Sequence, residues 1–274
     1  MFQIKIVSRP TKANIKNKYF TTINRIHNWA TNLCTAFNTK LCNLYLRGSI
    51  AHGCENSLSD LDIVILVKDC RLENILQFEN TIDTFNSLYN LPYWIDVRVF
   101  NLNSINSVEP SVNISDPIKD LVKKHLSFDI YANGICLAGT PLNDQTRIFT
   151  SPQEFIQNNC YIWGGYINNL VLDMQKQPSF NDYYSLIKKS IRLAAYIRFN
   201  TYSSYYGTLD KCYLAAIHDN PEIRAELTTL YKLLKQLNNN QSASINSQNR
   251  NALKVVTDYL LKICNRETSP LPKI

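Results

Sequence analysis

Two short motifs, LRGS at residues 46–49 and SDLD at residues 59–62, decide how this chain is interpreted. Nine residues separate Ser49 from Ser59, and the apolar run LDIVILV at residues 61–67 begins inside the second motif. A run of this length, apolar nearly throughout, indicates a strand that is buried on both faces. The first motif therefore precedes a buried strand, and the second motif contains the start of that strand.

Two aspartates, Asp60 and Asp62, lie at the start of this predicted strand. Because side chains alternate along a strand, positions 60 and 62 face the same side. Two carboxylates so close repel each other, and burying them is costly without a cation. Magnesium binds carboxylates and phosphate oxygens together. The pair is therefore predicted to hold Mg²⁺ beside a phosphorylated substrate.

A third carboxylate, Asp96, lies within the predicted strand 93–100, on the face opposite Ile95 and Val97. If this strand neighbours the first, three carboxylates converge. Such a cluster can hold two Mg²⁺ ions, which stabilise the attacking and leaving oxygens of an in-line phosphoryl displacement. The alternative for Asp96 is an ion pair with Arg98 on the same strand face.

The Gly48-Ser49 pair follows a short predicted strand at residues 44–46. A glycine at the end of a strand lets the backbone approach a phosphate closely. The backbone N–H groups that follow it, together with the Ser49 hydroxyl, can donate to phosphate oxygens. Gly48 and Ser49 are therefore predicted to bind a nucleoside triphosphate.

The spacing from Gly48-Ser49 to the paired aspartates resembles the hallmark motif of the DNA polymerase β-like nucleotidyltransferase superfamily, and the resemblance covers about residues 42–100. In that superfamily the paired aspartates bind metal, and a third acidic residue binds metal or activates the acceptor hydroxyl. The resemblance thus implies metal binding by Asp60, Asp62 and Asp96, and a catalytic role for Asp96.

The periodicity changes at about residue 145. Strands and helices mix before it, whereas helical patterns follow it, near 152–176, 182–202, 209–218, 221–238 and 248–264. The predicted fold class is α+β, with a small mixed β-sheet and flanking helices followed by an all-α helical bundle. The predicted domains are a nucleotidyltransferase domain at 1–145 and a C-terminal helical domain at 146–274.

The segment Gly134 to Gly139 precedes the helical half, which then contains Arg192 and Gly207 closely followed by Lys211. In these features the helical half resembles the C-terminal domain of aminoglycoside adenylyltransferases. In those relatives a lysine in this neighbourhood reaches the triphosphate, which implies nucleotide binding by Lys211 and, as a weaker match, Arg192. The alternative for Lys211 is a solvated helix lysine. The tyrosines at 202, 205 and 206 are interpreted as core packing, with base stacking or an acceptor pocket as the alternative.

Composition limits the remaining classes. The net charge of +7 and the pI of about 8.9 favour anionic partners such as nucleotides or RNA, unless the charge is simply spread over the surface. The eight cysteines include no C-x-x-C pair, so a zinc site has no support. No signal peptide or membrane-spanning apolar run is recognised, and a reducing cytoplasm is the expected compartment.

The predicted function is Mg²⁺-dependent transfer of a nucleoside monophosphate, with AMP from ATP favoured, to a hydroxyl of a small molecule, with release of pyrophosphate. Because a cationic aminoglycoside prefers an acidic cleft and this chain is basic, the aminoglycoside acceptor is not carried over. One alternative is transfer to RNA or tRNA ends, or to a protein side chain. A basic stripe of Lys188, Lys189, Arg192 and Arg198 would mark the RNA case. The other alternative is an inactive nucleotide-binding module.

Overall fold

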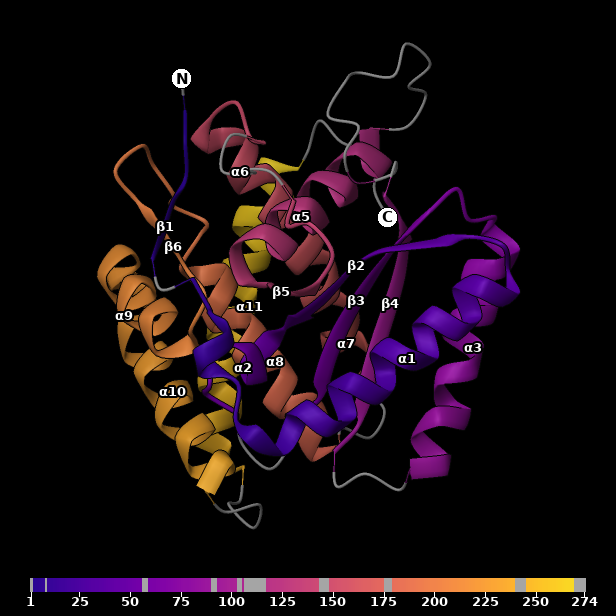
Figure 1. The fold of residues 1–274 in the computed structure, drawn as a ribbon. Helices are drawn as coiled ribbons and strands as arrows, with labels where there is room; N and C mark the ends of the chain where they lie inside the picture. The colour runs from indigo at the N-terminus through magenta and orange to yellow at the C-terminus, as the bar shows by residue number, and fades with distance from the viewer. Residues whose placement is uncertain are drawn as a thin grey trace. The chain divides into compact units, whose positions relative to one another are not determined.

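The computed structural model describes residues 2–7, 9–55, 59–89, 93–102, 105, 117–142, 148–174, 179–239 and 245–268 (Figure 1). The chain forms two compact units. The sheet unit consists of Ser8–Ser115 and Leu126–Ile148, and the helical unit of Met1–Val7, Asp116–His125 and Phe149–Ile274. The last entry of the chain into the helical unit, at Phe149, is close to the predicted boundary at 145; the division into two domains stays a prediction.

The sheet unit contains a four-stranded mixed sheet of order β4-β3-β2-β5. β3 pairs in parallel with β4, whereas β2 is antiparallel to both β3 and β5. The strands are β2 (Lys40–Arg47), β3 (Leu61–Lys68), β4 (Ile95–Asn101) and β5 (Ile135–Ala138). The predicted small mixed sheet is confirmed.

Strand β3 is buried on both faces, as its apolar sequence predicts. Leu61, Ile63 and Ile65 belong to a core that includes residues of α1 (Phe20–Ala36) and α3 (Leu72–Tyr89), and these two helices lie on the same side of the sheet (Figure 1). Val64 and Leu66, on the opposite face, pack with Ile130 of α5 (Pro117–Asn133). Position 62 therefore shares the face that α5 covers, because it alternates with position 63.

Residues 13–40 have a helical period in the sequence, which predicts one helix, but the structure does not form a single helix there. Two 3₁₀ turns, Lys12–Asn14 and Asn17–Tyr19, precede α1. α1 ends at Ala36, and Asn38 then adopts a left-handed backbone conformation with φ of 49°. The buried stripe of α1, which includes Ile23, Ile26 and Ala30, follows the predicted helical period.

The helical unit contains α6 to α11. Their bounds are α6 (Pro152–Asn159), α7 (Gly165–Asp173), α8 (Phe180–Ala194), α9 (Leu209–Asp219), α10 (Arg224–Asn239) and α11 (Ser247–Glu267). A π-helical turn, Cys160–Gly164, joins α6 to α7, and a 3₁₀ turn, Pro221–Ile223, precedes α10. α5 runs through both units, since its residues up to His125 belong to the helical unit and those from Leu126 to the sheet unit. Across the described residues, no helix combines the length and apolarity needed to cross a membrane.

The helical unit also contains two short strands, which the sequence did not predict. β6 (Ser204–Tyr206) pairs in parallel with β1 (Lys5–Val7), and α8 accordingly ends at Ala194 rather than near residue 202. Tyr205 is buried within β6 and stacks on Tyr196 with ring centroids 5.1 Å apart. A strand of three residues is too short to produce a period-two pattern, so its pairing depends on contacts far apart in the sequence.

Candidate functional site

Three charged side chains lie side by side at one end of the four-stranded sheet. Arg47 of β2 is the cross-strand neighbour of Asp62, and Asp62 is the parallel neighbour of Asp96 on β4. Cross-strand neighbours share a sheet face, and adjacent strands are about 4.8 Å apart. The adjacency of β3 and β4, on which the predicted convergence of carboxylates depended, is therefore confirmed.

Gly48 follows β2 directly, and its backbone lies against the Asp62 carboxylate. It has a left-handed φ of 75°, and a Cβ added to it would overlap Oδ2 of Asp62. Any larger residue would displace that carboxylate. The one-turn helix α2 (Gly48–Ala51) then begins, with Ile50 and Ala51 fully buried. The turn that was predicted to approach phosphate therefore also packs against the Asp62 carboxylate.

Arg47 is held by a partner that the sequence did not reveal. Its Nη1 donates to Oδ2 of Asp129 on α5 at 2.7 Å. Burial acts to lower the pKa of the Arg47 guanidinium, but Asp129, Asp62 and Asp96 together raise it above its ordinary value. Arg47 therefore stays cationic beside three carboxylates of the sheet unit.

A further chain of hydrogen bonds links this ion pair to the turn. Asn133 is buried one helical turn after Asp129 and donates to Oδ1 of Asp129 at 2.6 Å. The side-chain oxygen of Asn133 lies 3.3 Å from Nε2 of His52, the residue that ends α2. Polar residues four apart on α5 were the available sequence signal, but nothing in the sequence showed which strand they would meet.

Asp96 also makes the ion pair that was its alternative interpretation. Nε of Arg98 lies 3.2 Å from Oδ1 of Asp96, with the arginine side chain 55% and the aspartate 33% exposed. An exposed pair of this kind contributes about 0–1 kcal/mol, so it would not prevent Asp96 from binding a divalent cation. Asp96 therefore both pairs with Arg98 and lies next to Asp62 on the neighbouring strand.

Asp60 precedes β3 and is exposed. The next residue, Leu61, donates its backbone N–H to the carbonyl of Trp94 at 2.8 Å, which fixes the start of β3 to the start of β4. Over the described ranges, no group of three or more His, Cys, Asp or Glu side chains comes together as a metal-binding cluster. The neighbouring pair Asp62–Asp96 nevertheless fits Mg²⁺, which commonly takes one or two protein carboxylates together with substrate phosphates. Metal binding by all three aspartates stays a prediction.

Arg192 and Lys211 both belong to the helical unit. Arg192 donates from Nη2 to the carbonyl of Gly207 at 3.5 Å, in the turn before α9. Lys211 instead lines a pocket of about 490 Å³. The other lining residues are Ala195, Asn200, Tyr202, Ser203, Ser204, Tyr206, Leu214, Ala215, His218 and Asp219. The nucleotide contacts expected of Arg192 and Lys211 stay predictions.

The three tyrosines do not share one role. Tyr205 packs in the core, as interpreted from the sequence, whereas Tyr202 is 95% exposed and lines the pocket with Tyr206. The hydroxyl of Tyr196 donates to the carbonyl of Tyr206 at 2.7 Å, which anchors the backbone of β6 beneath this pocket wall. Aromatic side chains are thus available in the pocket, and core packing accounts for Tyr205.

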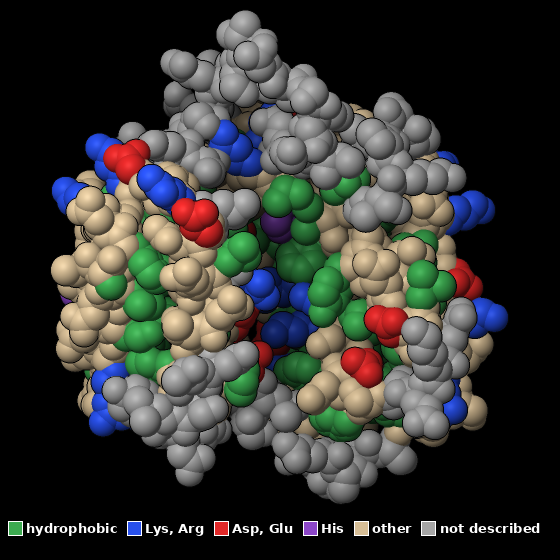
Figure 2. Space-filling view, turned by 90° about the vertical axis from the view of Figure 1, so that its right-hand side faces the viewer, with side chains coloured by type: hydrophobic (Ala, Val, Ile, Leu, Met, Phe, Trp, Pro, Cys, Tyr) green, Lys and Arg blue, Asp and Glu red, His purple; other side chains and the backbone are tan. Residues whose placement is uncertain are grey.

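The basic stripe expected for RNA binding is not continuous. Nζ of Lys189 lies over the rings of Trp163 and Tyr166, at 4.6 and 4.3 Å from their centroids. Arg198 lies beyond the end of α8 and donates to Glu222 at 2.7 Å and to the Tyr259 hydroxyl at 2.6 Å. On the face drawn in Figure 2, basic and acidic side chains are interspersed. Part of the positive charge therefore serves contacts within the helical unit.

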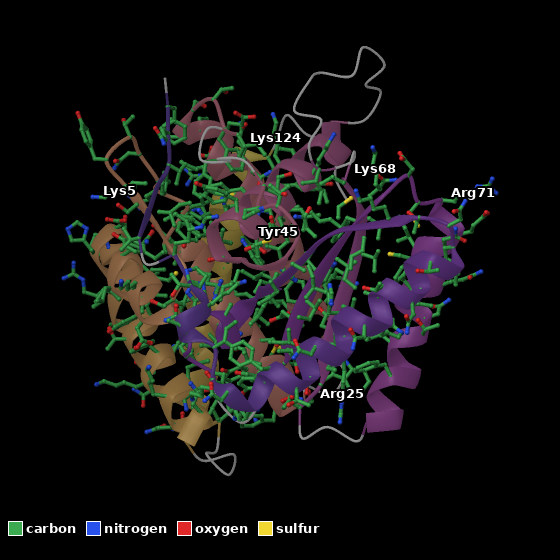
Figure 3. All side chains as sticks on the ribbon, in the orientation of Figure 1. Lys5, Arg25, Tyr45, Lys68, Arg71 and Lys124 are labelled. Carbon is green, nitrogen blue, oxygen red and sulfur yellow. The ribbon has the colours of Figure 1, made fainter. Side chains whose placement is uncertain are left out.

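Side chains on the α5-covered face also anchor the sheet. Tyr45, labelled in Figure 3, lies two residues before Arg47 and so shares its face, and its hydroxyl accepts from the backbone N–H of Leu142 at 2.7 Å. The Tyr45 ring is buried against Val64 and Ile130. The strand that carries Arg47 is therefore fixed by core packing up to the residue before the charged group.

Comparisons with known proteins support the fold. No family model matches the chain, and no curated protein matches it. Among solved structures, the spectinomycin adenyltransferase from Enterococcus faecialis, determined with ATP and spectinomycin, is similar at a TM-score of 0.60 and 12% sequence identity. The match covers 90% of this chain and 99% of that one. At this identity the likeness shows the fold, and it confirms the predicted arrangement of a small mixed sheet followed by helices.

Proposed function

We propose that this chain is a metal-dependent nucleotidyltransferase that transfers AMP from ATP to a hydroxyl of a small molecule and releases pyrophosphate. The observation that carries the proposal is the register of the sheet, which pairs Asp62 with Asp96 directly beside the Gly48-Ser49 turn. Neighbouring carboxylates next to a glycine turn can hold magnesium together with the phosphates of a nucleotide.

The residues of the sheet unit would divide the work as follows. The backbone N–H groups after Gly48 and the Ser49 hydroxyl bind phosphate oxygens of the nucleotide. Asp62 and Asp96, together with Asp60, would hold Mg²⁺, which would supply positive charge to neutralise the phosphates. The acceptor oxygen forms a bond to the α-phosphorus while the bond from that phosphorus to the bridging oxygen breaks. Asp96 takes the hydroxyl proton, and pyrophosphate leaves.

The fold neighbour supports the choice of ATP and of a small acceptor, because that enzyme was solved with ATP and spectinomycin. We further propose that Lys211 and Arg192 of the helical unit contact the triphosphate, as the sequence resemblance implies. A cation near the leaving pyrophosphate would stabilise the charge that develops there. The acceptor itself is proposed only as a class, a hydroxyl-bearing small molecule.

Two alternatives have less support. Transfer to RNA would require a continuous basic surface, and two of the four expected side chains, Lys189 and Arg198, are engaged within the helical unit. An inactive nucleotide-binding module would be expected to lack part of the carboxylate set, yet Asp60, Asp62 and Asp96 are all present.

The test is a transfer assay with the purified chain, Mg²⁺ and each of the four α-labelled nucleoside triphosphates. The acceptors are a panel of hydroxyl-bearing small molecules, including aminoglycosides, and total tRNA. We expect label from ATP on a small acceptor, with equal release of pyrophosphate and no transfer in EDTA. Label on tRNA alone would favour the RNA alternative. Nucleotide binding without turnover for any acceptor would favour the inactive module.

A further inference from the structure

Arg47 is an unusual residue in the sheet unit, because a charged side chain occupies the last position of a buried strand. Its side chain is only 28% exposed, and that of its partner Asp129 only 16%. Its Nε is buried and has no hydrogen-bond partner among the described residues. Burying a guanidinium is costly unless its donors are used, so this arrangement needs a reason beyond the stability of the sheet.

Three carboxylates of the sheet unit surround Arg47. Arg47 faces Asp129 through a direct ion pair and Asp62 through the strand register, and Asp96 is the next carboxylate along the sheet. A guanidinium presents five N–H donors in a planar fork, and the Asp129 bond engages one nitrogen. The guanidinium also lies near Asp62, whose charge raises the arginine pKa and whose carboxylate lies against Gly48.

We propose that Arg47 is a phosphate-binding residue of this site, with the polyphosphate of a nucleoside triphosphate as its ligand, and that Asp129 is the residue that positions it. The inference rests on the proposed function. A guanidinium matches two phosphate oxygens at once, and this bidentate geometry is worth most where water is largely excluded. Arg47 is adjacent in sequence to the backbone N–H groups expected to bind the same phosphates.

The role of Asp129 follows from the network behind it. Asp129 accepts from Arg47, which precedes the turn, and from Asn133, which contacts His52 after the turn. Two residues of one helix, α5, thus hold both ends of the four-residue helix α2. Such fixation keeps the donors in place before the ligand arrives, which reduces the entropy lost on binding.

The experiment measures binding, so it does not depend on turnover. Calorimetry with the full chain would compare Mg-ATP, AMP and, in EDTA, inorganic tripolyphosphate. The variants are Arg47→Gln, Arg47→Lys and Asp129→Asn. The matched control is Arg71→Gln, because Arg71 is also an arginine of the sheet unit but its side chain is 82% exposed (Figure 3). Thermal unfolding would establish that each variant is folded.

We expect Arg47→Gln to weaken binding of Mg-ATP and of tripolyphosphate by about 10- to 100-fold, the usual loss for charge-assisted hydrogen bonds, with AMP affected less than about 3-fold. Arg47→Lys keeps the charge and should recover part of the affinity. Asp129→Asn leaves Arg47 in place but loosely held, so its loss should be smaller, about 3- to 10-fold. Arg71→Gln should bind as the wild type does.

Unchanged binding of tripolyphosphate and Mg-ATP by folded Arg47→Gln would overturn the inference, and so would equal losses for ATP and AMP, which would indicate a structural role. If Arg47→Gln fails to fold, Arg47→Lys and Asp129→Asn give the answer by the same criterion. A wild-type chain that binds neither ATP nor tripolyphosphate would refute the proposed function itself. A wild type that binds and transfers, with Arg47 variants that do likewise, would refute only the inference.

Discussion

Two partly buried ion pairs, one in each unit, have almost the same geometry. Arg47 and Asp129 of the sheet unit are 2.7 Å apart, with side chains 28% and 16% exposed. Lys124 and Glu154 of the helical unit are 2.6 Å apart, with side chains 23% and 20% exposed. Their surroundings differ, and the difference separates a pair suited to a ligand from a pair suited to folding.

The helical pair satisfies its groups locally. One oxygen of Glu154 accepts from Lys124, and the other accepts from the backbone N–H and the hydroxyl of Thr150. Ser151, the N-cap of α6, accepts from the backbone N–H of Glu154. All these contacts tie the start of α6 to α5, so the pair has a complete structural role.

The sheet pair leaves one buried donor of its arginine unused by the described residues. Arg47 has a buried Nε without a partner in the described part of the chain, and the carboxylates of Asp62 and Asp96 follow along the same sheet end. An unused donor on a buried cation is expected where a ligand completes its hydrogen bonds. We therefore propose that the sheet unit's ion pair serves ligand binding and that the helical unit's pair serves stability.

The largest expected effect comes from Asp62→Asn. Asp62 is the central carboxylate between Arg47 and Asp96, so its loss should reduce transfer by at least about 10³-fold, a typical cost of removing a key electrostatic group. Because like charges are removed from the sheet end, the melting temperature should stay the same or rise. Steady-state transfer beside thermal unfolding checks this. Normal transfer by Asp62→Asn would show that the sheet end is not the reaction site.

The next effect concerns Asp96 and its proposed role as general base. Asp96→Asn keeps the size of the side chain but cannot take a proton, so kcat should fall by about 10²-fold or more. Affinity for Mg-ATP should change much less, since Asp62 and the Gly48 turn remain. Single-turnover transfer and ATP calorimetry separate the two quantities. Equal losses would make Asp96 a plain metal ligand, and no loss in either would leave only its ion pair with Arg98.

A glycine pair sharpens the comparison further. Gly48→Ala places a Cβ against the Asp62 carboxylate, whereas Gly53→Ala, with a similar φ of 65°, meets the backbone oxygen of Asn14 at 3.1 Å. Both variants should lose about 1–3 kcal/mol of unfolding free energy from the strained backbone. Only Gly48→Ala should also lose most of its transfer activity. Urea unfolding and transfer by the two variants test this, and equal activity would mean that Gly48 does not support Asp62.

The sequence was informative where the structure is local. The end of β2, the Gly48 turn and the start of β3 lie within 20 residues, and period two alone assigned Asp62 to a face. The pairing of β3 with β4 was an assumption that the structure confirmed, because a buried central strand needs a neighbour on each side.

The rest depended on contacts between distant segments. Asp129 and Asn133 read as ordinary polar helix residues, and only the packing of α5 against the sheet brings them to Arg47. The strand β6 has no period of its own and exists because β1 pairs with it. The predicted helix at 182–202 placed Arg198 in a basic helical stripe, but α8 ends at Ala194, before Arg198. Such choices are made by tertiary packing, which local patterns do not encode.

The smallest effect is expected at the helical pair, and it tests the other side of the comparison. Glu154→Gln should lower the unfolding free energy at neutral pH by about 1–2 kcal/mol, since a partly buried lysine loses its ionic partner. Mg-ATP binding and transfer should stay as in the wild type, in contrast to Asp129→Asn.

The stabilising effect of Glu154 should depend on pH. Burial acts to raise the pKa of the Glu154 carboxyl, but hydrogen bonds from Lys124 and Thr150 lower that pKa overall. A carboxyl with a lowered pKa stabilises the fold above its ordinary value, about 4.3, and this contribution is lost as the pH falls through the lower folded value. The difference between wild type and Glu154→Gln should therefore be largest near pH 7 and shrink below about pH 4. Urea unfolding at several pH values measures it. A difference that does not change with pH would mean that the ionised pair contributes nothing, and weaker ATP binding by Glu154→Gln would remove the distinction between the two pairs.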